Sequence, residues 1–427
     1  MAKNKVHEII ITPQMFISPP FKKCPYCKEK EFGVVHIGDR TYTRRCRRCL
    51  QSSSYKLPPI KKRVLYLDQM AISEMMKLLN PKFNETRKSK VKSIWKDLFG
   101  KLDRLVKLQL IICPDSTSHY YESLIVPEYY QVLKRMYEQL SNGISFHDAE
   151  VIKSFQISLN FREWMGEKNL KDIDIYNVTS GHDIDSWQDR LRISVGVNDF
   201  DESIITNIKE EREIVGEKMK KVFERWQTEK SKNFTDWYEE ERSAFGKMVF
   251  RSYLENIISD NPFSMMSQTN TLVVDLINRL SDKGLSNEEA LQKIILYFGS
   301  NQIKEVPYIK ISAGLFASIA RKAANGQKKP LTIGDVNDIK AISSLAPYCE
   351  AMFIDNKMYS LLTERVDGKQ LREFVGLNTK FYCQNTMDDF LDFLQKIEES
   401  ASKSHLAKVK EVYGDTWGEP FVEMYEY

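Results

Sequence analysis

The sequence predicts an α/β protein in which helices flank a parallel sheet, a small cysteine-rich module precedes the sheet, and a long helical segment interrupts it. Two apolar runs, at 64–67 and at 351–354 within a strand expected at 349–354, indicate buried parallel strands because their side chains do not alternate with polar ones. Two CxxC pairs within residues 24–49 mark the small module. A 3.6-residue apolar period through residues 141–305 marks the helical segment.

The composition predicts a chain that neither crosses a membrane nor is secreted. The 427 residues contain no apolar run of about 18 residues. The N-terminal residues lack the apolar stretch and small-residue cleavage site of a signal peptide. Seven cysteines are an odd number, and four of them form CxxC pairs, which suits a reducing compartment. We therefore expect a cytoplasmic protein.

Positive charge is concentrated near the N-terminus. Residues 20–63 contain thirteen Lys or Arg and three acids, a net charge of +10, which leaves −6 for the rest of a chain whose total is +4. A concentrated basic patch favours a polyanionic partner, and we predict nucleic acid. The alternative is a solvated surface that aids solubility.

The cysteine pairs predict a structural zinc site. Eighteen residues separate the two pairs, and two short strands are expected between them, at 32–37 and 40–44, joined by a turn at Gly38–Asp39. The module thus resembles a zinc ribbon, and four thiolates leave no open position on the metal. His36 is expected to be a surface residue of its strand. The predicted zinc ligands are Cys24, Cys27, Cys46 and Cys49.

The ribbon is expected to present four arginines to a phosphate backbone, with a protein partner as the alternative. These are Arg44, Arg45, Arg47 and Arg48. Residues 52–59 are predicted to be a linker, since they are rich in Ser and Pro. The acidic, aromatic C-terminal tail is expected to dock on the body or on the ribbon. The predicted units are the ribbon with its linker at 1–58, the first part of the α/β domain at 59–130, a helical insertion at 131–309, and the second part with the tail at 310–427.

Hydrophobic periodicity predicts the remaining elements. Strands are expected at 63–67, 107–113, 349–354 and 380–383. Helices are expected at 74–79, 87–106, 117–140, 201–230, 235–258, 269–280, 287–298, 311–325, 335–345, 356–364 and 387–398. The stretch DSWQDRLR, residues 185–192, is interpreted as a surface salt-bridge face, with substrate contact as the alternative.

Four acidic residues flank the predicted strands. Asp68 ends the first strand and Asp355 the strand at 349–354, so both leave the same sheet edge if these strands are parallel. Glu122 follows the second strand, and Asp338 begins the helix before the third. Four such carboxylates would repel one another and need a cation, and their hard oxygen donors select Mg²⁺ or Mn²⁺. The alternative is that each caps a helix.

The order and spacing of these motifs resemble the PIN-like nuclease superfamily. The resemblance is carried by LDQMAIS from Leu67, by CPDSTSHYYESL with Glu122, and by NDIKAISSLAPYCEAMFIDN, in which Asp338 and Asp355 lie seventeen residues apart. It covers residues 63–130 and 310–397.

The resemblance implies a PIN-like sheet flanked by helices and a metal-dependent nuclease, most often acting on RNA. It implies a catalytic and metal-binding quartet of Asp68, Glu122, Asp338 and Asp355. We therefore predict an endoribonuclease that hydrolyses phosphodiester bonds with Mg²⁺ or Mn²⁺. A DNA nuclease is one alternative. Another is a non-catalytic RNA- or protein-binding module that uses the basic ribbon and a degenerate PIN-like body.

Two features depart from the family pattern. Glu122 and Asp338 lie 216 residues apart, much farther than in compact PIN domains, so the insertion at 131–309 is expected to restrict the groove or bind a protein partner. Gln69 and Met70 replace the small polar residues that commonly follow the first aspartate.

Other polar residues near the motifs are secondary candidates. Asp335 is an alternative third ligand, and Glu74 could replace one ligand, although the outer face of its helix is favoured. His119 could contact phosphate, although a structural role is favoured. Ser73 and Ser116 are expected to support the ligands without binding the metal.

Overall fold

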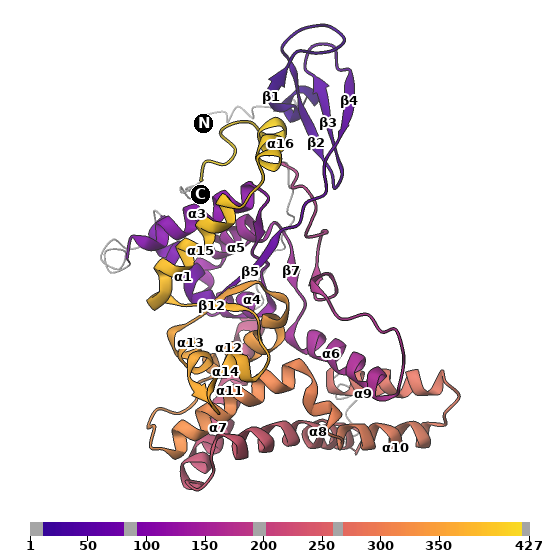
Figure 1. Ribbon diagram of the computed structural model, residues 1–427, viewed down its shortest axis with the longest axis vertical. Coiled ribbons are helices and arrows are strands. Elements are labelled where there is room, and N and C mark those ends of the chain that lie inside the picture. The colour runs from indigo at the N-terminus through magenta and orange to yellow at the C-terminus, as the bar shows by residue number, and fades with distance from the viewer. Residues whose placement is uncertain (1–11, 81–91, 191–201, 259–267, 421–427) are drawn as a thin grey trace, which may run out of the picture.

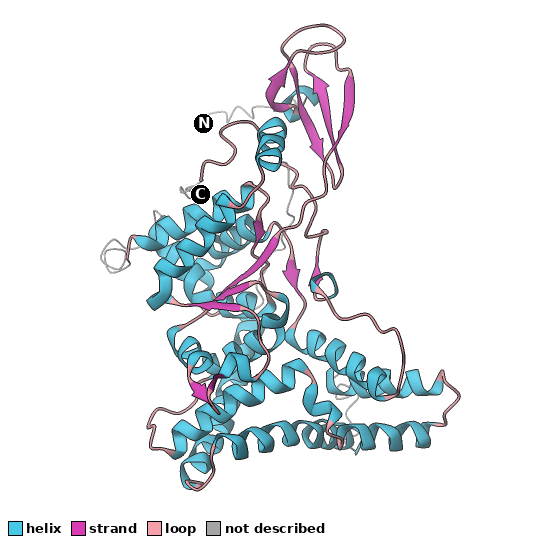
Figure 2. Ribbon diagram, viewed as in Figure 1, coloured by secondary structure: helices cyan, strands magenta, loops and turns pink. Residues whose placement is uncertain are grey.

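The computed structural model describes residues 12–80, 92–190, 202–258 and 268–420. Three parts follow one another along the longest axis of the molecule: a small β module, a mixed α/β body, and a bundle of long helices (Figure 1). Figure 2 shows the strands gathered mainly in the first two parts, with the far end helical. Among the described residues, no helix is both long and apolar enough to cross a membrane.

The β module is a four-stranded antiparallel sheet with the order β1-β2-β3-β4. Its strands are β1 (Ser18–Lys22), β2 (Phe32–Ile37), β3 (Thr41–Cys46) and β4 (Ser52–Lys56), preceded by a 3-10 turn at Pro13–Phe16. The predictions of strands at 32–37 and 40–44 are confirmed by β2 and β3. The prediction of a linker at 52–59 is wrong over its first half, because Ser52–Lys56 pairs with β3 residue by residue.

The body contains a parallel sheet with the order β12-β9-β5-β6, which confirms the α/β class. Its strands are β5 (Arg63–Leu67), β6 (Ile111–Ile112), β9 (Ala351–Phe353) and β12 (Lys380–Tyr382). Along β5, Leu65 and Leu67 enter one hydrophobic core, whereas Val64 and Tyr66 enter another. The apolar run is unbroken because both faces of the sheet are covered.

Helices cover both faces. One face packs against α1 (Gln69–Leu79), α3 (Ile94–Lys107), α5 (Pro127–Ser141) and α15 (Met387–Glu399). The other packs against α11 (Pro307–Ala324), α12 (Ile333–Leu345), α13 (Asn356–Thr363) and α14 (Leu371–Phe374). From β5 the chain first adds β6 on one side, and it then returns past β5 to add β9 and β12 on the other side. The order in which strands are added therefore reverses between β5 and β9. That reversal is where open α/β sheets bind ligands.

Five long helices of the predicted insertion divide between two cores. They are α6 (Ala149–Trp164), α7 (Glu202–Thr228), α8 (Phe234–Ile258), α9 (Gln268–Ser281) and α10 (Asn287–Phe298). Trp226 of α7 and Trp237 of α8 are buried in the same cluster as Val64 and Met352 of the sheet, which α6 also joins. A separate core around Leu276 is formed by α9 and α10 with parts of α6 and α8. Helices α6, α7 and α8 therefore help to cover one face of the sheet.

Two predictions near the second strand are wrong. The strand expected at 107–113 is reduced to Ile111–Ile112, because α3 continues to Lys107 and Gln109 turns with a φ of 61°. The helix expected at 117–140 is two helices, α4 (Thr117–Leu124) and α5, because the proline at the start of α5 has no N–H to continue the ladder.

The expectation of almost continuous helix at 141–305 also needs correction. Between α6 and α7, the described residues 165–190 are largely irregular. They contain a 3-10 turn at Ile175–Asn177 and the short strand β8 (Thr179–Ser180), which pairs with β7 (Ser145–Phe146) ahead of α6. Of the other predicted helices, the one at 287–298 is found with the predicted bounds and the rest have shifted ends, while parts of two of them, residues 87–91 and 201, lie outside the described residues. The remaining short elements are Gln302–Glu305, Ala346–Tyr348, β10 (Arg365–Val366), β11 (Lys369–Gln370) and Gln384–Thr386.

The C-terminal helix α16 (Lys403–Tyr413) joins the ribbon to the body. Val409 and Val412 pack in one cluster with Val34 and Leu57 of the ribbon side. After α16, the Trp417 indole N–H donates to the Lys107 carbonyl at 2.9 Å. The C-terminal segment thus contacts both the ribbon and the body, while residues 421–427 lie outside the described part of the chain.

Candidate active site

Asp68 lies where β5 ends and α1 begins. The last apolar residue of the strand, Leu67, is buried, and the Asp68 backbone N–H still donates to the Phe353 carbonyl of β9 at 2.9 Å. The Asp68 side chain makes no capping hydrogen bond to α1, although it stands at the N-cap position. The backbone N–H groups of Gln69 and Met70, at the start of α1, nevertheless lower the pKa of this carboxylate against the effect of burial.

Asp355 occupies the matching position after β9. Its Oδ1 accepts a hydrogen bond from the Met358 N–H at 2.6 Å, so this aspartate does cap its helix, α13. The side chain nevertheless lines the same pocket as Asp68. Because β5 and β9 are parallel neighbours, both carboxylates leave the same edge of the sheet.

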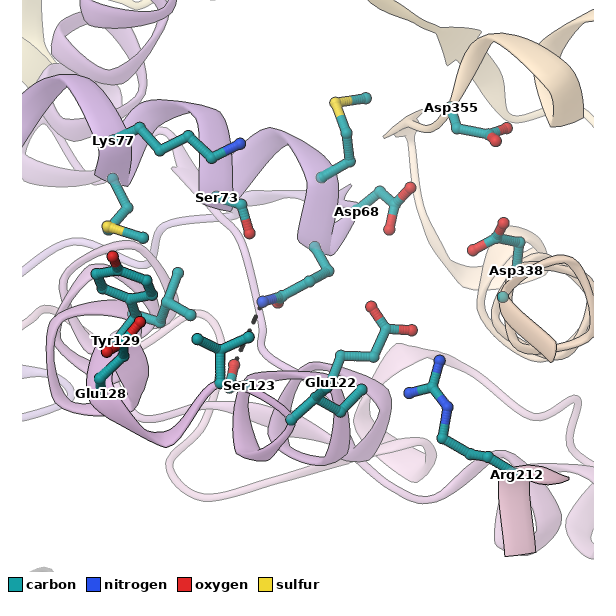
Figure 3. Close-up of a pocket in the computed structure, with 17 residues that line it drawn as sticks. Asp68, Ser73, Lys77, Glu122, Ser123, Glu128, Tyr129, Arg212, Asp338 and Asp355 are labelled. Carbon is teal, nitrogen blue, oxygen red and sulfur yellow. Dashed lines mark hydrogen bonds between the residues drawn. The ribbon is translucent and has the colours of Figure 1, made fainter. Parts of the chain in front are cut away.

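Glu122 and Asp338 approach the pocket from two helices. Glu122 lies on α4, which is tied to the end of β5 because a His119 ring nitrogen, Nε2, lies 2.8 Å from the Leu67 carbonyl. Asp338 lies on α12, opposite Asp68 (Figure 3). All four acids thus line one pocket of about 640 Å³ at the carboxyl edge of the sheet.

The four carboxyl groups disfavour one another's charge. Burial, followed by the negative charges of Glu122 and Asp355, raises the pKa of Asp68 to about 7. Burial, followed by the charges of Asp68 and Asp355, raises the pKa of Asp338 to about 9. Burial also raises the pKa values of Glu122 and Asp355. Such a pocket favours protons or a metal ion as a source of compensating charge.

The four acids of the pocket offer carboxylate oxygens, the type of donor that Mg²⁺ and Mn²⁺ prefer. Its carboxylates are more widely spaced than the cysteines of the ribbon. Within the described part of the chain, only those cysteines form a group of three or more His, Cys, Asp or Glu ligand atoms within 4.8 Å of one another. Because Mg²⁺ usually retains several waters, a wide ring of carboxylates is compatible with it.

A basic residue from the insertion also lines this pocket. Arg212 of α7 faces Glu122 (Figure 3), and its positive charge lowers the pKa of Glu122 against the effect of burial. The sequence analysis missed Arg212, because nothing in its local pattern distinguishes it from the other charges of a long helix. Lys77 of α1 is a second cation at the pocket, where it pairs with Glu74.

The secondary candidates have other partners or positions. Asp335 caps α12 through Thr332 and pairs with Lys357, so its carboxylate is already occupied. Glu74 pairs with Lys77 one turn along α1.

His119 and the two serines also have defined places. His119 is buried and stacked between Tyr66 and Tyr137, and burial lowers its pKa to about 4, which supports the structural interpretation. Ser73 lines the acidic pocket, whereas Ser116 accepts a hydrogen bond from the His119 N–H and caps α4.

The four cysteines of the ribbon converge as predicted. The Sγ atoms of Cys24 and Cys49 lie 3.7 Å apart, and those of Cys27 and Cys46 lie 3.6 Å apart. Four thiolates about 2.3 Å from a tetrahedral zinc ion would be separated by about 3.8 Å. This cluster can therefore hold a metal ion such as zinc. His36 stays outside it and pairs with Asp189, as expected of a surface residue.

The arginines of the ribbon are not equivalent. Arg44 is only 1% exposed, and its guanidinium donates to three backbone carbonyls, so its assignment to phosphate binding is wrong. Arg45 is half-buried and donates to the Leu50 carbonyl. Arg47 and Arg48 are exposed: the first donates to the Ile17 carbonyl and the second pairs with Glu29.

The stretch DSWQDRLR joins the ribbon to the body, which corrects its interpretation as a surface salt-bridge face. Trp187 is buried and donates to the Pro58 carbonyl at 2.8 Å. Asp189 binds His36, and Arg190 donates to the Tyr413 carbonyl of α16. Residues 191 and 192 lie outside the described ranges.

Comparison with protein-family models, curated proteins and solved structures finds no match to this chain. The resemblance to the PIN-like superfamily stays a prediction based on motifs.

Proposed function

We propose that this chain is a metal-dependent nuclease, and specifically an endoribonuclease. One observation carries the proposal: Asp68, Glu122, Asp338 and Asp355, from four separate elements, line one pocket at the reversal point of a parallel sheet. Structural ion pairing alone does not require so many mutually repelling carboxylates in one place.

The four carboxylates would hold Mg²⁺ or Mn²⁺. When bound, the cation would supply Lewis-acid stabilisation of phosphate charge and lower the pKa of a water molecule. Arg212 and Lys77 are placed to hold non-bridging phosphate oxygens. A pocket carboxylate accepts the proton of the attacking water, whose oxygen bonds to phosphorus. The bond from phosphorus to the leaving oxygen then breaks, and that oxygen takes up a proton. No side-chain nucleophile is needed.

We further propose zinc as the metal of the cysteine cluster. Four thiolates complete a tetrahedral shell, so this zinc would be structural. The exposed Arg47 and Arg48 remain candidates for contact with nucleic acid. The ribbon would then add affinity, while the acidic pocket would carry out the chemistry.

The decisive variant is Asp68→Asn, assayed with labelled single-stranded RNA, single-stranded DNA and duplexes in Mg²⁺ or Mn²⁺. We expect the wild-type protein to cleave RNA and EDTA to stop it. The variant should lose at least about 100-fold of the rate, because one metal ligand disappears, while RNA binding is retained.

The matched control is Asp392→Asn, which removes the same charge from an exposed position on α15. It should leave cleavage unchanged. RNA binding without metal-dependent cleavage by the wild-type protein would contradict the nuclease proposal and favour the non-catalytic alternative. Faster cleavage of DNA than of RNA would reassign the substrate.

A further inference from the structure

A second pocket, lined by tyrosines, adjoins the acidic pocket. It has a volume of about 460 Å³ and lies where the chain leaves edge strand β6, at Asp115 and Ser116. Its aromatic lining includes Tyr120 and Tyr121 of α4 and Tyr130 of α5. Ser123 of α4 lines both pockets, so the two pockets meet at this short helix.

Two of these tyrosine rings, Tyr120 and Tyr121, are accessible, and the third, Tyr130, is buried against Tyr120. Tyr120 is 43% exposed and Tyr121 is 47% exposed, with ring centroids 5.6 Å apart. Tyr130 packs edge-on against Tyr120, at 6.0 Å and 83°. One exposed aromatic residue needs no explanation, but adjacent exposed rings beside a candidate active site indicate a binding surface. Tyr120 and Tyr121 directly precede Glu122, so the helix that holds the rings also carries a pocket carboxylate.

The order of the strands indicates the path that a bound polymer would follow across the edge of the sheet. The acidic pocket lies at the carboxyl ends of β9 and β5, and the tyrosine pocket follows β6, the next strand in the sheet. Neighbouring strands are about 4.8 Å apart, so a chain crossing this edge passes from one pocket into the other. Lys134 of α5 also lines the tyrosine pocket. Its Nζ lies 3.9 Å from Glu138 Oε1, and from this position it can also approach a backbone phosphate.

We propose that Tyr120 and Tyr121, with the buried Tyr130 packed against Tyr120, form a stacking subsite for an unpaired nucleobase next to the phosphate in the acidic pocket. The substrate class is therefore single-stranded nucleic acid. Every base has a face that can stack on tyrosine, whereas bases within a duplex already stack on each other and do not expose those faces. This inference rests on the proposed nuclease function, whose substrate it specifies.

The test measures RNA binding in the absence of cleavage. Fluorescence anisotropy with labelled single-stranded and duplex RNA would compare four proteins, all carrying Asp68→Asn. They are the parent, Tyr120→Leu with Tyr121→Leu, Tyr120→Phe with Tyr121→Phe, and the control Phe155→Leu, which alters a ring of 40% exposure lining a different pocket. The leucine pair should weaken single-strand binding about 10-fold or more, whereas the phenylalanine pair and the control should stay within about 2-fold.

A modified RNA identifies the contact. One abasic nucleotide beside the cleavage position should weaken binding by the parent protein to a similar extent. The same RNA should cause no further loss with the leucine pair, because the stacking partner is already gone. Should the leucine pair fail to fold, Tyr121→Leu alone, at the more exposed ring, carries the same comparison.

The possible results separate this inference from the proposed function. Cleavage by the wild-type protein together with unchanged binding by the leucine pair overturns the subsite but not the nuclease, and leaves the rings available for a protein surface. Equal losses on duplex and single strand also overturn the subsite. Tyrosine-dependent binding without any cleavage by the wild-type protein supports the subsite and overturns the nuclease. Absence of RNA binding by the wild-type protein overturns both.

Discussion

At the scale of single residues, Asp68 and Asp355 have the same sequence context but different roles. Each follows a buried strand and precedes a helix. Asp355 caps its helix through the Met358 N–H, whereas Asp68 makes no capping hydrogen bond. The Gln69 and Met70 N–H groups do lower the pKa of Asp68, but burial and the neighbouring carboxylates raise it to about 7. The buried charge of Asp68 therefore lowers stability unless a bound cation compensates it.

Asp338→Asn is expected to stabilise the protein when divalent cations are absent. The pKa of Asp338 is raised to about 9, so the unfolded chain gives up its proton at lower pH than the folded one. Stability is therefore lost as pH rises from about 4 towards 9. The variant should gain about 1–3 kcal/mol in free energy of unfolding at pH 8, and less at pH 5. Urea unfolding in EDTA measures this, and a loss of stability at both pH values would contradict it.

Arg212→Gln is expected to change metal binding and RNA cleavage in opposite directions. Removing a positive charge that faces Glu122 should strengthen Mg²⁺ binding. Losing a phosphate contact should slow cleavage about 10- to 100-fold. Calorimetry and a cleavage assay measure the two effects, and Arg212→Lys should retain part of the activity. A parallel loss of both would indicate that Arg212 only maintains the fold.

At the scale of elements, α16 and the ribbon form one unit. The Arg44 guanidinium donates to the carbonyls of Pro20, Phe32 and Glu411, at 2.6–3.1 Å. The Glu411 side chain in turn accepts a hydrogen bond from the Tyr42 hydroxyl at 2.8 Å. A C-terminal helix therefore stabilises an N-terminal sheet.

Arg44→Gln and Arg48→Gln remove the same charge with different expected effects. Arg44→Gln should destabilise the ribbon by about 2–4 kcal/mol, because it leaves buried carbonyls without donors. Arg48→Gln should change stability by less than about 1 kcal/mol, because only an exposed pair with Glu29 is lost. Thermal unfolding compares the two. Arg44→Gln is compared directly with Arg48→Gln, which should report only on RNA binding. If Arg48→Gln weakens RNA binding while Arg44→Gln does not unfold the ribbon, then the hydrogen bonds of buried Arg44 stabilise the ribbon less than their number indicates.

At the scale of the whole molecule, separate cores let the parts respond differently to metal removal. The cysteine cluster has a small core of its own around Phe32, whereas two large cores cover the body sheet. We expect the stability of the ribbon to depend on the metal that its cysteines could hold, because the ribbon is too small for an adequate core. We expect the stability of the body not to depend on that metal.

Zinc chelation is expected to unfold the ribbon and leave the body folded. Limited proteolysis after treatment with a strong chelator should cut within residues 12–62, while a fragment containing the two sheet cores persists. Zinc should restore resistance, and Mg²⁺ should not. Cooperative loss of the entire fold would show that the contacts of α16 and Trp187 couple the parts more strongly than expected.

The sequence by itself determined three of the four strands of the body sheet, the cysteine cluster and the positions of the four acids, because each depends on a short pattern. An unbroken apolar run reports burial on two faces, and CxxC spacing reports a metal-binding turn. Only the tertiary structure decided that these acids share one pocket, that Arg212 joins them, and that Arg44 is buried beneath α16. Those outcomes depend on how distant surfaces dock. Docking is set by the packing of whole faces, which no local periodicity of charge or hydrophobicity encodes.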